Sequence, residues 1–374
     1  MNAPRVIVCA GGGGVGKTTT SAALALSFAN DGFNTLVVTV DPARRLAQAL
    51  GVELGAEVRD VSTVGNGRLH ALMPDPALSS KHFLRILFDG APASVERVEA
   101  NPVYAALSSG LAGMHEVVSL MLIARAVEEH AYDVVVVDTA PSRYALDFVG
   151  YPGRLASLFE GKAVGWFAAL APKAKTQDLD EQSSDGGLLS WGKRKAEALV
   201  AKILGPSTAE AITDLFGELA RARERFANLS RTAETLLLGE QTRFILVAAP
   251  TGSAVADAEY LATHLVDLGK RPSAIVLNRA DRDVPSWLRG DPNAAPDALS
   301  ELLELARRER GAIVKAADAA ERELRSRIPK ATLVRLPTVD DWDPRRVVET
   351  LGTELEPLGA SITRAPSPSR APSA

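Results

Sequence analysis

The chain has 374 residues, of which 46% are apolar and 24% charged, a balance typical of a globular protein of enzyme size. Its net charge of −4 gives no electrostatic attraction to nucleic acid or to an anionic membrane, so we expect no nucleic-acid partner and only indirect membrane contact. A single cysteine, Cys9, excludes an internal disulfide. Without a signal segment or an apolar run approaching about 18 residues, the sequence predicts a cytoplasmic protein.

The first predicted element is an apolar strand at residues 5–10, followed by a glycine-rich loop that satisfies G-x-x-x-x-G-K-[ST] and then by a helical sequence. Glycines in such a loop let successive backbone N–H groups turn onto phosphate oxygens, which a Cβ would obstruct. We expect Lys17 on the β- and γ-phosphates and the Thr18 hydroxyl on Mg²⁺. The predicted nucleotide contacts in this loop are Gly12, Gly13, Gly14, Val15, Gly16, Lys17, Thr18 and Thr19.

Short Val, Ile and Leu runs recur along the chain, with helical patterns between them. The predicted strands are residues 5–10, 35–40, 69–73, 134–138, 244–248, 273–278 and 332–336. Runs of this kind are typical of a mainly parallel sheet that is covered on both faces. The expected fold class is therefore α/β: a P-loop NTPase with a mainly parallel central sheet flanked by helices.

Two long gaps between these strands are mostly helical. Insertions at about 76–130 and 150–240 are therefore expected to form a helical subdomain within a single domain, 1–360, and residues 361–374 to form a disordered tail. Apolar side chains from Leu155 to Leu219 recur at helical spacing. This pattern favours a helix-to-helix core, and the alternative is a groove for an apolar client helix.

Polar residues end three of the predicted strands, at the sheet edge where α/β proteins bind ligands. Asp41 is expected to orient an attacking water, and Asp138 to hold Mg²⁺ directly or through water, as a Walker B aspartate does. Either aspartate alone also fits a helix or turn cap. Asn278 carries an amide that can both donate to and accept from an adenine edge, although asparagine after a strand is usually a turn residue.

Together these motifs resemble those of the ArsA/Get-type ATPases of the deviant Walker A class, over essentially the whole chain. The matching segments are GGGGVGKTTT at 11–20, DPARRLAQALG at 41–51, GMHE at 113–116, DTAPSRYALDF at 138–148, VLNR at 276–279 and LPTVDDWD at 336–343. The resemblance implies a dimeric ATPase with two nucleotides at the subunit interface. It also implies that Asn278 and the Pro337 loop surround adenine, and that the helical insertion carries the cargo or effector site.

The sequence departs from this family pattern at several positions. Family members carry a lysine five residues before the loop lysine, which crosses the interface to the partner's phosphates, and Gly12 stands in its place. Arg44 and Arg45 replace the usual His-Asn of the first switch, and Tyr144 replaces a histidine of the second. These differences resemble the lysine-lacking subunit of paired bacterial Get-like ATPases. They imply a heterodimer with a lysine-bearing paralogue, or a homodimer in which an arginine replaces the charge.

Two activities of the wider family do not suit these residues. Arsenite binding needs several converging thiolates, which one cysteine cannot supply, and the five histidines have no spacing for zinc, so no zinc is expected. The sequence predicts a Mg²⁺-dependent ATPase and dimeric switch that uses ATP/ADP, with Lys17 and Asp41 catalytic, and that handles a hydrophobic client or a membrane-associated partner. One alternative is a regulatory scaffold with little turnover. The glycine at position 12, where the family has a lysine, leaves this alternative open. The other is a partition-type positioning ATPase, against which the helical insertions argue.

Overall fold

The computed structural model of the chain describes residues 4–41, 43–63, 65–75, 78–108, 114–140, 206–288 and 297–363. The chain divides into two compact units. The first consists of residues 1–75, 126–149 and 235–374, and the second of residues 76–125 and 150–234. The second unit overlaps the two insertions expected to form a helical subdomain.

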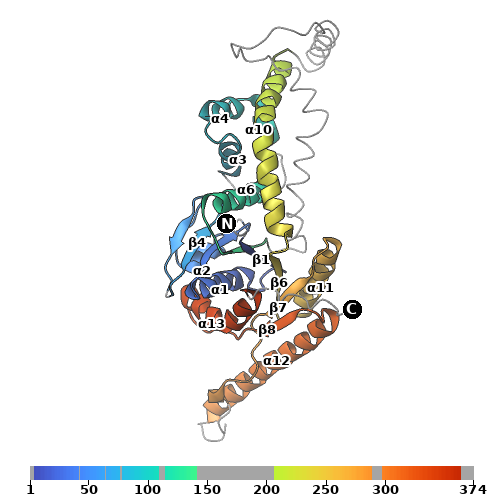
Figure 1. The fold of residues 1–374 in the computed structure, drawn as a ribbon. Helices are drawn as coiled ribbons and strands as arrows, with labels where there is room; N and C mark the ends of the chain where they lie inside the picture. Colours follow the sequence, from blue (N-terminus) through green and yellow to red (C-terminus); the bar gives the residue numbers. More distant parts are fainter. Residues whose placement is uncertain are drawn as a thin grey trace, which may run out of the picture. The chain divides into compact units, whose positions relative to one another are not determined.

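A sheet of eight strands lies at the centre of the described part of the first unit (Figure 1). Its strands are β1 (Arg5–Gly11), β2 (Asn34–Thr39), β3 (Arg59–Val61), β4 (Arg68–Leu72), β5 (Val134–Asp138), β6 (Thr242–Ala248), β7 (Pro272–Leu277) and β8 (Thr332–Arg335). Their order across the sheet is β3-β4-β2-β5-β1-β6-β7-β8. All pairs are parallel except β3 with β4, so the predicted α/β class is confirmed.

The central strands consist of β-branched and aliphatic runs because both of their faces are covered. In β5, Val134 to Asp138 are all buried, as is expected for a parallel strand between two layers. The sequence analysis missed β3. This edge strand is only Arg-Asp-Val, with two of its three residues exposed, and so it shows neither an apolar run nor an alternating pattern.

Five helices accompany the sheet within the described part of the first unit: α1 (Lys17–Asn30), α2 (Arg45–Leu50), α11 (Gly252–Asp267), α12 (Asp297–Arg327) and α13 (Pro344–Thr363). α1 and α13 pack along one another, and strand residues such as Ile7, Cys9 and Val136 belong to the same buried cluster. The predicted tail needs a correction, since residues 361–363 continue α13. Its remaining residues, 364–374, lie outside the described part.

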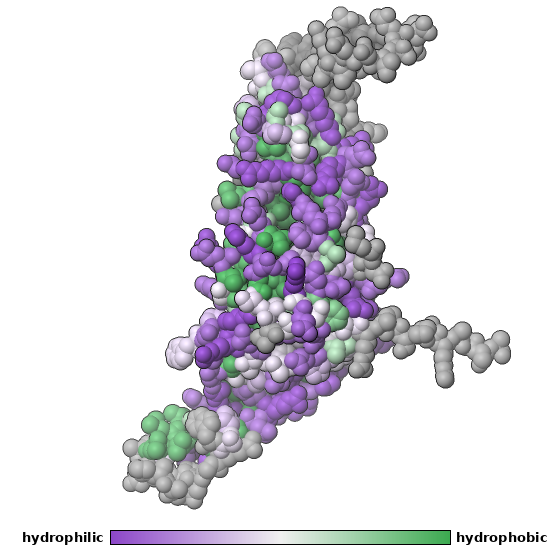
Figure 2. Space-filling view, turned by 60° about the vertical axis from the view of Figure 1, so that its left-hand side comes forward, coloured by the Kyte–Doolittle hydropathy of each residue, from purple (hydrophilic) through white to green (hydrophobic). Residues whose placement is uncertain are grey.

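α12 is the charged segment of the first unit. Its i,i+4 ion pairs are Arg308–Glu304, Arg325–Glu321 and Arg327–Glu323. Near its N-terminal end Leu299, Leu302 and Leu305 are exposed, which accounts for a green patch in the lower part of Figure 2. A short 3₁₀ helix, η3 (Ser286–Leu288), precedes it, and Arg307 of α12 donates to the carbonyl of Leu288.

The described part of the second unit is helical. It contains α3 (Ser79–Leu87), α4 (Pro92–Glu99) and α5 (Pro102–Ser108), and α6 (Met114–Glu129) and α10 (Pro206–Leu238) have residues in both units. The buried Glu218 on α10 accepts hydrogen bonds from Arg97 at 2.7 Å and from Arg221 at 2.8 Å. Asn101 donates to the carbonyl of Ala211 at 2.7 Å. Among the described helices of the chain, none is long and apolar enough to cross a bilayer.

Candidate nucleotide site

The glycine-rich loop connects β1 to α1. Gly14 and Gly16 have φ angles of 71° and 90°, a left-handed conformation that side chains disfavour. A Cβ at Gly16 would also collide with Nδ2 of Asn278. Since Gly16 is the N-cap of α1 and carries no side chain, the first N–H groups of this helix depend on solvent or on an anion for partners. The loop therefore combines glycine-dependent geometry with an anion-binding helix terminus.

Lys17, the first residue of α1, is buried within this loop. Its Nζ donates a hydrogen bond to the carbonyl oxygen of Gly12 at 2.8 Å. Burial lowers the pKa of Lys17, while the charges of Asp138 and Asp41 raise it. The ammonium group of Lys17 is thus enclosed by the loop in which it is predicted to bind phosphate, near the carboxylates of Asp138 and Asp41. Val15 is buried in the core, Thr19 is half-buried, and Gly13 and Gly14 are exposed.

Asp138 is the centre of a buried hydrogen-bond cluster at the end of β5. Its Oδ2 accepts from the hydroxyls of Thr18 at 2.8 Å and Thr39 at 2.9 Å, and its Oδ1 accepts from Ser21 at 3.4 Å. Burial raises the pKa of Asp138 to about 6, against the effect of these hydroxyl donors. Thr18 and Asp138 were expected to share one site. Thr39 and Ser21 were not expected there, although both occupy positions adjacent to the predicted motifs.

The register of the sheet explains this arrangement. Asp138 pairs with Cys9, two residues before the end of β1, and with Thr39, the last residue of β2, so β5 brings its carboxylate between these two neighbouring strands. Cys9 is buried, and burial raises the pKa of its thiol to about 12. That thiol is consequently a small apolar side chain of the core rather than a reactive group.

Asp41 follows β2 and is also buried. Its backbone N–H donates to the Thr39 hydroxyl at 3.1 Å, which links it to the Asp138 cluster. Oδ1 of Asp41 accepts from the N–H of Ala43 at 3.0 Å, and Oδ2 accepts from Nη1 of Arg45 at 3.0 Å. The sequence analysis named both Asp41 and Arg45, but it did not predict that they pair with one another.

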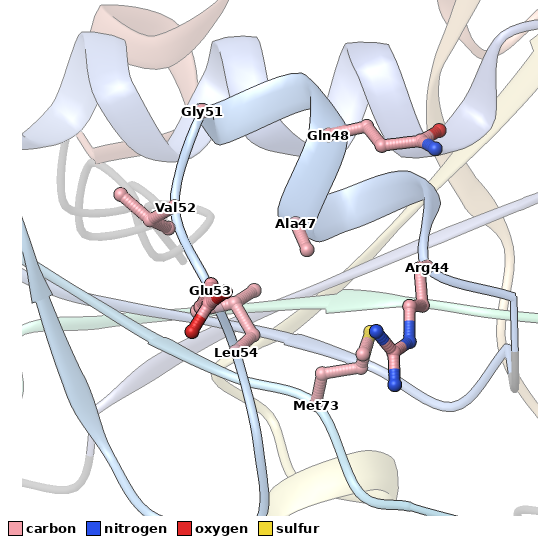
Figure 3. A pocket seen from close by; sticks show the side chains of 8 residues that line it. All are labelled: Arg44, Ala47, Gln48, Gly51, Val52, Glu53, Leu54 and Met73. Atoms are coloured by element: carbon pink, nitrogen blue, oxygen red, sulfur yellow. The ribbon is translucent and has the colours of Figure 1, made fainter.

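Arg44 lies in different surroundings from Arg45. It lines a pocket of about 540 Å³, in which its guanidinium points towards Met73, with Leu54 and Glu53 on the neighbouring wall (Figure 3). The guanidinium of Arg44 makes no hydrogen bond or ion pair with any residue that the structure describes. The side chains of two arginines that are adjacent in the sequence therefore lie in different surroundings, one in this pocket and the other against Asp41.

Asn278 follows β7 and is buried against the glycine-rich loop. Its Nδ2 donates to the carbonyl of Val15 at 2.9 Å, which uses one of the two N–H groups of the amide that was predicted to read adenine. Pro337 lies two residues after the end of β8, which is the strand next to β7 in the sheet. Leu336 donates its N–H to the carbonyl of Leu277, and Ala280 donates to the carbonyl of Leu336, so these two strand ends lie side by side.

Gly12, the position of the missing lysine, is covered by Asp257 of α11. A Cβ built at Gly12 would collide with the carboxylate of Asp257, whereas one at Gly13 would meet no atom within 4 Å. Nothing in the sequence pattern singled out Asp257, because it lies on an ordinary helix far from any motif. The second switch lies outside the described residues from 141 onwards, including Tyr144.

The family model of the ArsA ATPases, described as anion-transporting ATPases, matches residues 4–284. The chain belongs to the ArsA ATPase family. Membership accounts for the glycine-rich loop, the order of the strands around it and the aspartates at their ends, and it makes the chain an ATPase.

Curated proteins that are named as ATPases resemble the chain, two of them over more than half of its length. ATPase GET3 of Malassezia globosa is 30% identical over 274 residues, which cover 73% of this chain and 72% of the relative. ATPase GET3 of Ajellomyces dermatitidis is 28% identical over 246 residues, 64% of this chain and 67% of the relative. A shorter match, to ATPase ASNA1 homolog 1 of Paramecium tetraurelia, is 30% identical over 146 residues, 39% and 43% of the two chains.

Proposed function

We propose that this ATPase is a Mg²⁺-dependent switch that works as a dimer. The observation that carries the proposal is the 2.8 Å hydrogen bond from the Thr18 hydroxyl to the Asp138 carboxylate, which unites the glycine-rich loop with the end of a central strand. In nucleotide-hydrolysing P-loop proteins, a loop hydroxyl and a strand-end aspartate of this kind hold the metal ion that accompanies the phosphates.

The residues present suit a magnesium ion. Thr18 and Asp138 offer hydroxyl and carboxylate oxygens, the hard ligands that Mg²⁺ prefers. The raised pKa of the buried Asp138 reports a desolvated carboxylate, which a nearby cation would stabilise in its charged form. When bound, Mg²⁺ would neutralise charge on the phosphate oxygens.

Each remaining residue has a distinct task in this proposal. Lys17 and the loop N–H groups bind the phosphates, and the ammonium exchanges the Gly12 carbonyl for phosphate oxygens. Asp41 orients the water that attacks the terminal phosphorus. Asn278 and Pro337, which follow the adjacent strands β7 and β8, would bind adenine.

In this proposal a second subunit supplies the positive charge that glycine at position 12 cannot provide. The absence of a side chain at this position, and the carboxylate of Asp257 beside it, leave no lysine to reach the phosphates of a neighbouring subunit. We propose either a heterodimer with a lysine-bearing paralogue or a homodimer in which an arginine replaces this charge.

A hydrophobic protein client, or a membrane-associated partner, is proposed for the helical unit. Of the apolar stripe in the sequence, only the end on α10 lies in the described part, where Leu215 is buried and Ile212, Phe216 and Leu219 are half-buried. Leu215 therefore belongs to a core. The stretch from Leu155 to Ile203 lies outside the described residues, and the groove interpretation rests on its sequence pattern alone.

A regulatory scaffold that binds ATP with little turnover is the second candidate. The ion pair between Asp41 and Arg45 favours it, because a carboxylate whose charge is shared with an arginine attracts a proton of the attacking water less strongly. The two candidates differ in a measurable way: the switch releases phosphate in every cycle, whereas the scaffold holds ATP without releasing phosphate.

The test measures ATP binding and phosphate release by the full chain, with Mg²⁺ and with EDTA. We expect Lys17→Ala to abolish both, because it removes the lysine of the loop, and EDTA to abolish phosphate release. Lys315→Ala, at an exposed lysine on α12, is the matched control and should behave as the wild type. Undiminished hydrolysis by Lys17→Ala would refute the proposed site. Binding without release in the presence of Mg²⁺ would favour the scaffold.

A further inference from the structure

Each carboxylate oxygen of Asp41 accepts one hydrogen bond from within the chain. Oδ1 accepts from the N–H of Ala43 and Oδ2 accepts from Arg45, each at 3.0 Å. The Asp41 side chain is 7% exposed, whereas that of Arg45 is 57% exposed. One partner is thus fixed by the backbone, and the other is a long side chain that reaches in from solvent and can leave without a change of fold.

Arg45 lies close to the cation of the glycine-rich loop. Its charge opposes protonation of Lys17, whose pKa is lowered first by burial and in part by this neighbour. Two cations therefore lie near one another, and each is held by an acceptor of the chain: Lys17 by the carbonyl of Gly12, and Arg45 by Asp41.

A triphosphate at this site would compete for both cations. A guanidinium forms paired hydrogen bonds with phosphate oxygens, and these charge-assisted bonds are stronger than a partly exposed ion pair with one carboxylate oxygen. Because Arg45 is the first residue of α2, its side chain can turn away from Asp41 while the helix stays in place.

We propose that Arg45 is a phosphate-binding residue that exchanges the carboxylate of Asp41 for the phosphate oxygens of ATP, and that this exchange releases Asp41. The inference rests on the proposed ATP site and adds to it a residue that couples nucleotide binding to the state of the first switch. While Arg45 is paired with Asp41, it neutralises the carboxylate, and a phosphate that draws Arg45 away restores the full charge of the water-orienting group.

Arg44 provides a matched control. It has the same side chain one residue earlier, but its guanidinium points into the pocket beside Met73 and makes no hydrogen bond or ion pair with any described residue (Figure 3). If any positive charge near the site strengthened ATP binding, loss of either arginine would weaken the binding equally. The proposed exchange predicts instead that, of the two arginines, only loss of Arg45 weakens it.

The experiment is a double-mutant cycle on the dissociation constant of ATP, measured by titration calorimetry with Arg45→Ala, Asp41→Asn and the double variant. We expect Arg45→Ala to weaken binding by about tenfold or more, as for loss of a charge-assisted hydrogen bond. Asp41→Asn should tighten binding because it frees Arg45 and removes a negative charge. The gain should be larger with Arg45 present than in the Arg45→Ala background.

Arg44→Ala should leave the ATP affinity unchanged, and Arg45→Lys should recover part of the loss, since it keeps the charge but not the paired geometry. Thermal unfolding without nucleotide checks that each variant is folded. Equal gains from Asp41→Asn in both backgrounds, or an unchanged affinity in Arg45→Ala, would overturn the inference. If the wild type binds no ATP, or Lys17→Ala binds it equally well, the proposed ATP site itself is wrong.

Discussion

The side chain of Asn278 donates a hydrogen bond of 2.9 Å from Nδ2 to the carbonyl oxygen of Val15, 263 residues earlier in the chain. Both residues are buried, so water does not compete for this bond. It joins the end of β7 to the turn of the glycine-rich loop, directly beside Gly16, where a Cβ would collide with the same amide. The shape of the loop is therefore set partly by the strand on the far side of β6.

Asn278→Ala should destabilise the chain. It removes the donor and leaves the buried carbonyl of Val15 without its partner, which costs about 1–3 kcal/mol. Urea unfolding measures the change in the free energy of unfolding. Asn66→Ala, at an exposed position, is the control and should leave that free energy unchanged. Equal effects of the two substitutions would show that the bond to Val15 contributes nothing.

Asp138 should make the stability of the empty protein depend on pH. Its pKa is raised from 3.8 to about 6 by burial, so the native state binds a proton more tightly than the unfolded state. The contribution to stability is then largest below about pH 4 and is lost as the pH rises through about 6, by about 3 kcal/mol in total. Urea unfolding at a series of pH values measures this loss.

Asp138→Asn isolates the effect, because the amide does not titrate. The wild type should lose stability relative to this variant between about pH 4 and 6, and the difference should stay constant above that range. A constant difference across the whole range would contradict the raised pKa. With ATP and Mg²⁺ present we expect the charged carboxylate to be favoured, so the loss should move to lower pH.

Gly12 and Gly13 should respond differently to a methyl group. Gly12→Ala places a Cβ against the carboxylate of Asp257, whereas Gly13→Ala enters open space. We expect Gly12→Ala to lower the free energy of unfolding by about 1 kcal/mol and Gly13→Ala to have little effect. In an Asp257→Ala background the cost of Gly12→Ala should disappear. If it persists, Asp257 is not the group that restricts position 12.

The isolated chain should hydrolyse ATP slowly. A cation supplied across a subunit interface is worth about 10³–10⁵ in rate at comparable phosphoryl-transfer sites, and Gly12 supplies none. Phosphate release should rise sharply when a lysine-bearing paralogue is mixed in. Gly12→Lys alone should restore little, because Asp257 occupies the space that its Cβ needs, and Gly12→Lys with Asp257→Ala should do better. Fast turnover by the chain alone would contradict the argument.

Much of this site follows from residue type and order. The sequence of the glycine-rich loop predicts its backbone geometry, because glycine readily adopts the positive φ angles found at positions 14 and 16. The parallel sheet then brings Asp138 to Thr18, since the ends of parallel strands meet at one edge. The pairing of Arg45 with Asp41 and the place of Asp257 beside Gly12 were beyond reach of the sequence. Their importance comes from the rotamer of one side chain and the approach of one helix, and neither leaves a periodic pattern.

β5 lies between β1 and β2 in the sheet, although it follows both in the chain. The first two strands to be synthesised therefore cannot pair with one another in the native register, and the gap between them closes only when residues 134–138 arrive. Joining strands so distant in sequence requires closing long loops, which makes this step slow. During translation the edges of β1 and β2 stay unpaired until β5 inserts, so this interval is when the nascent chain has most need of protection from aggregation.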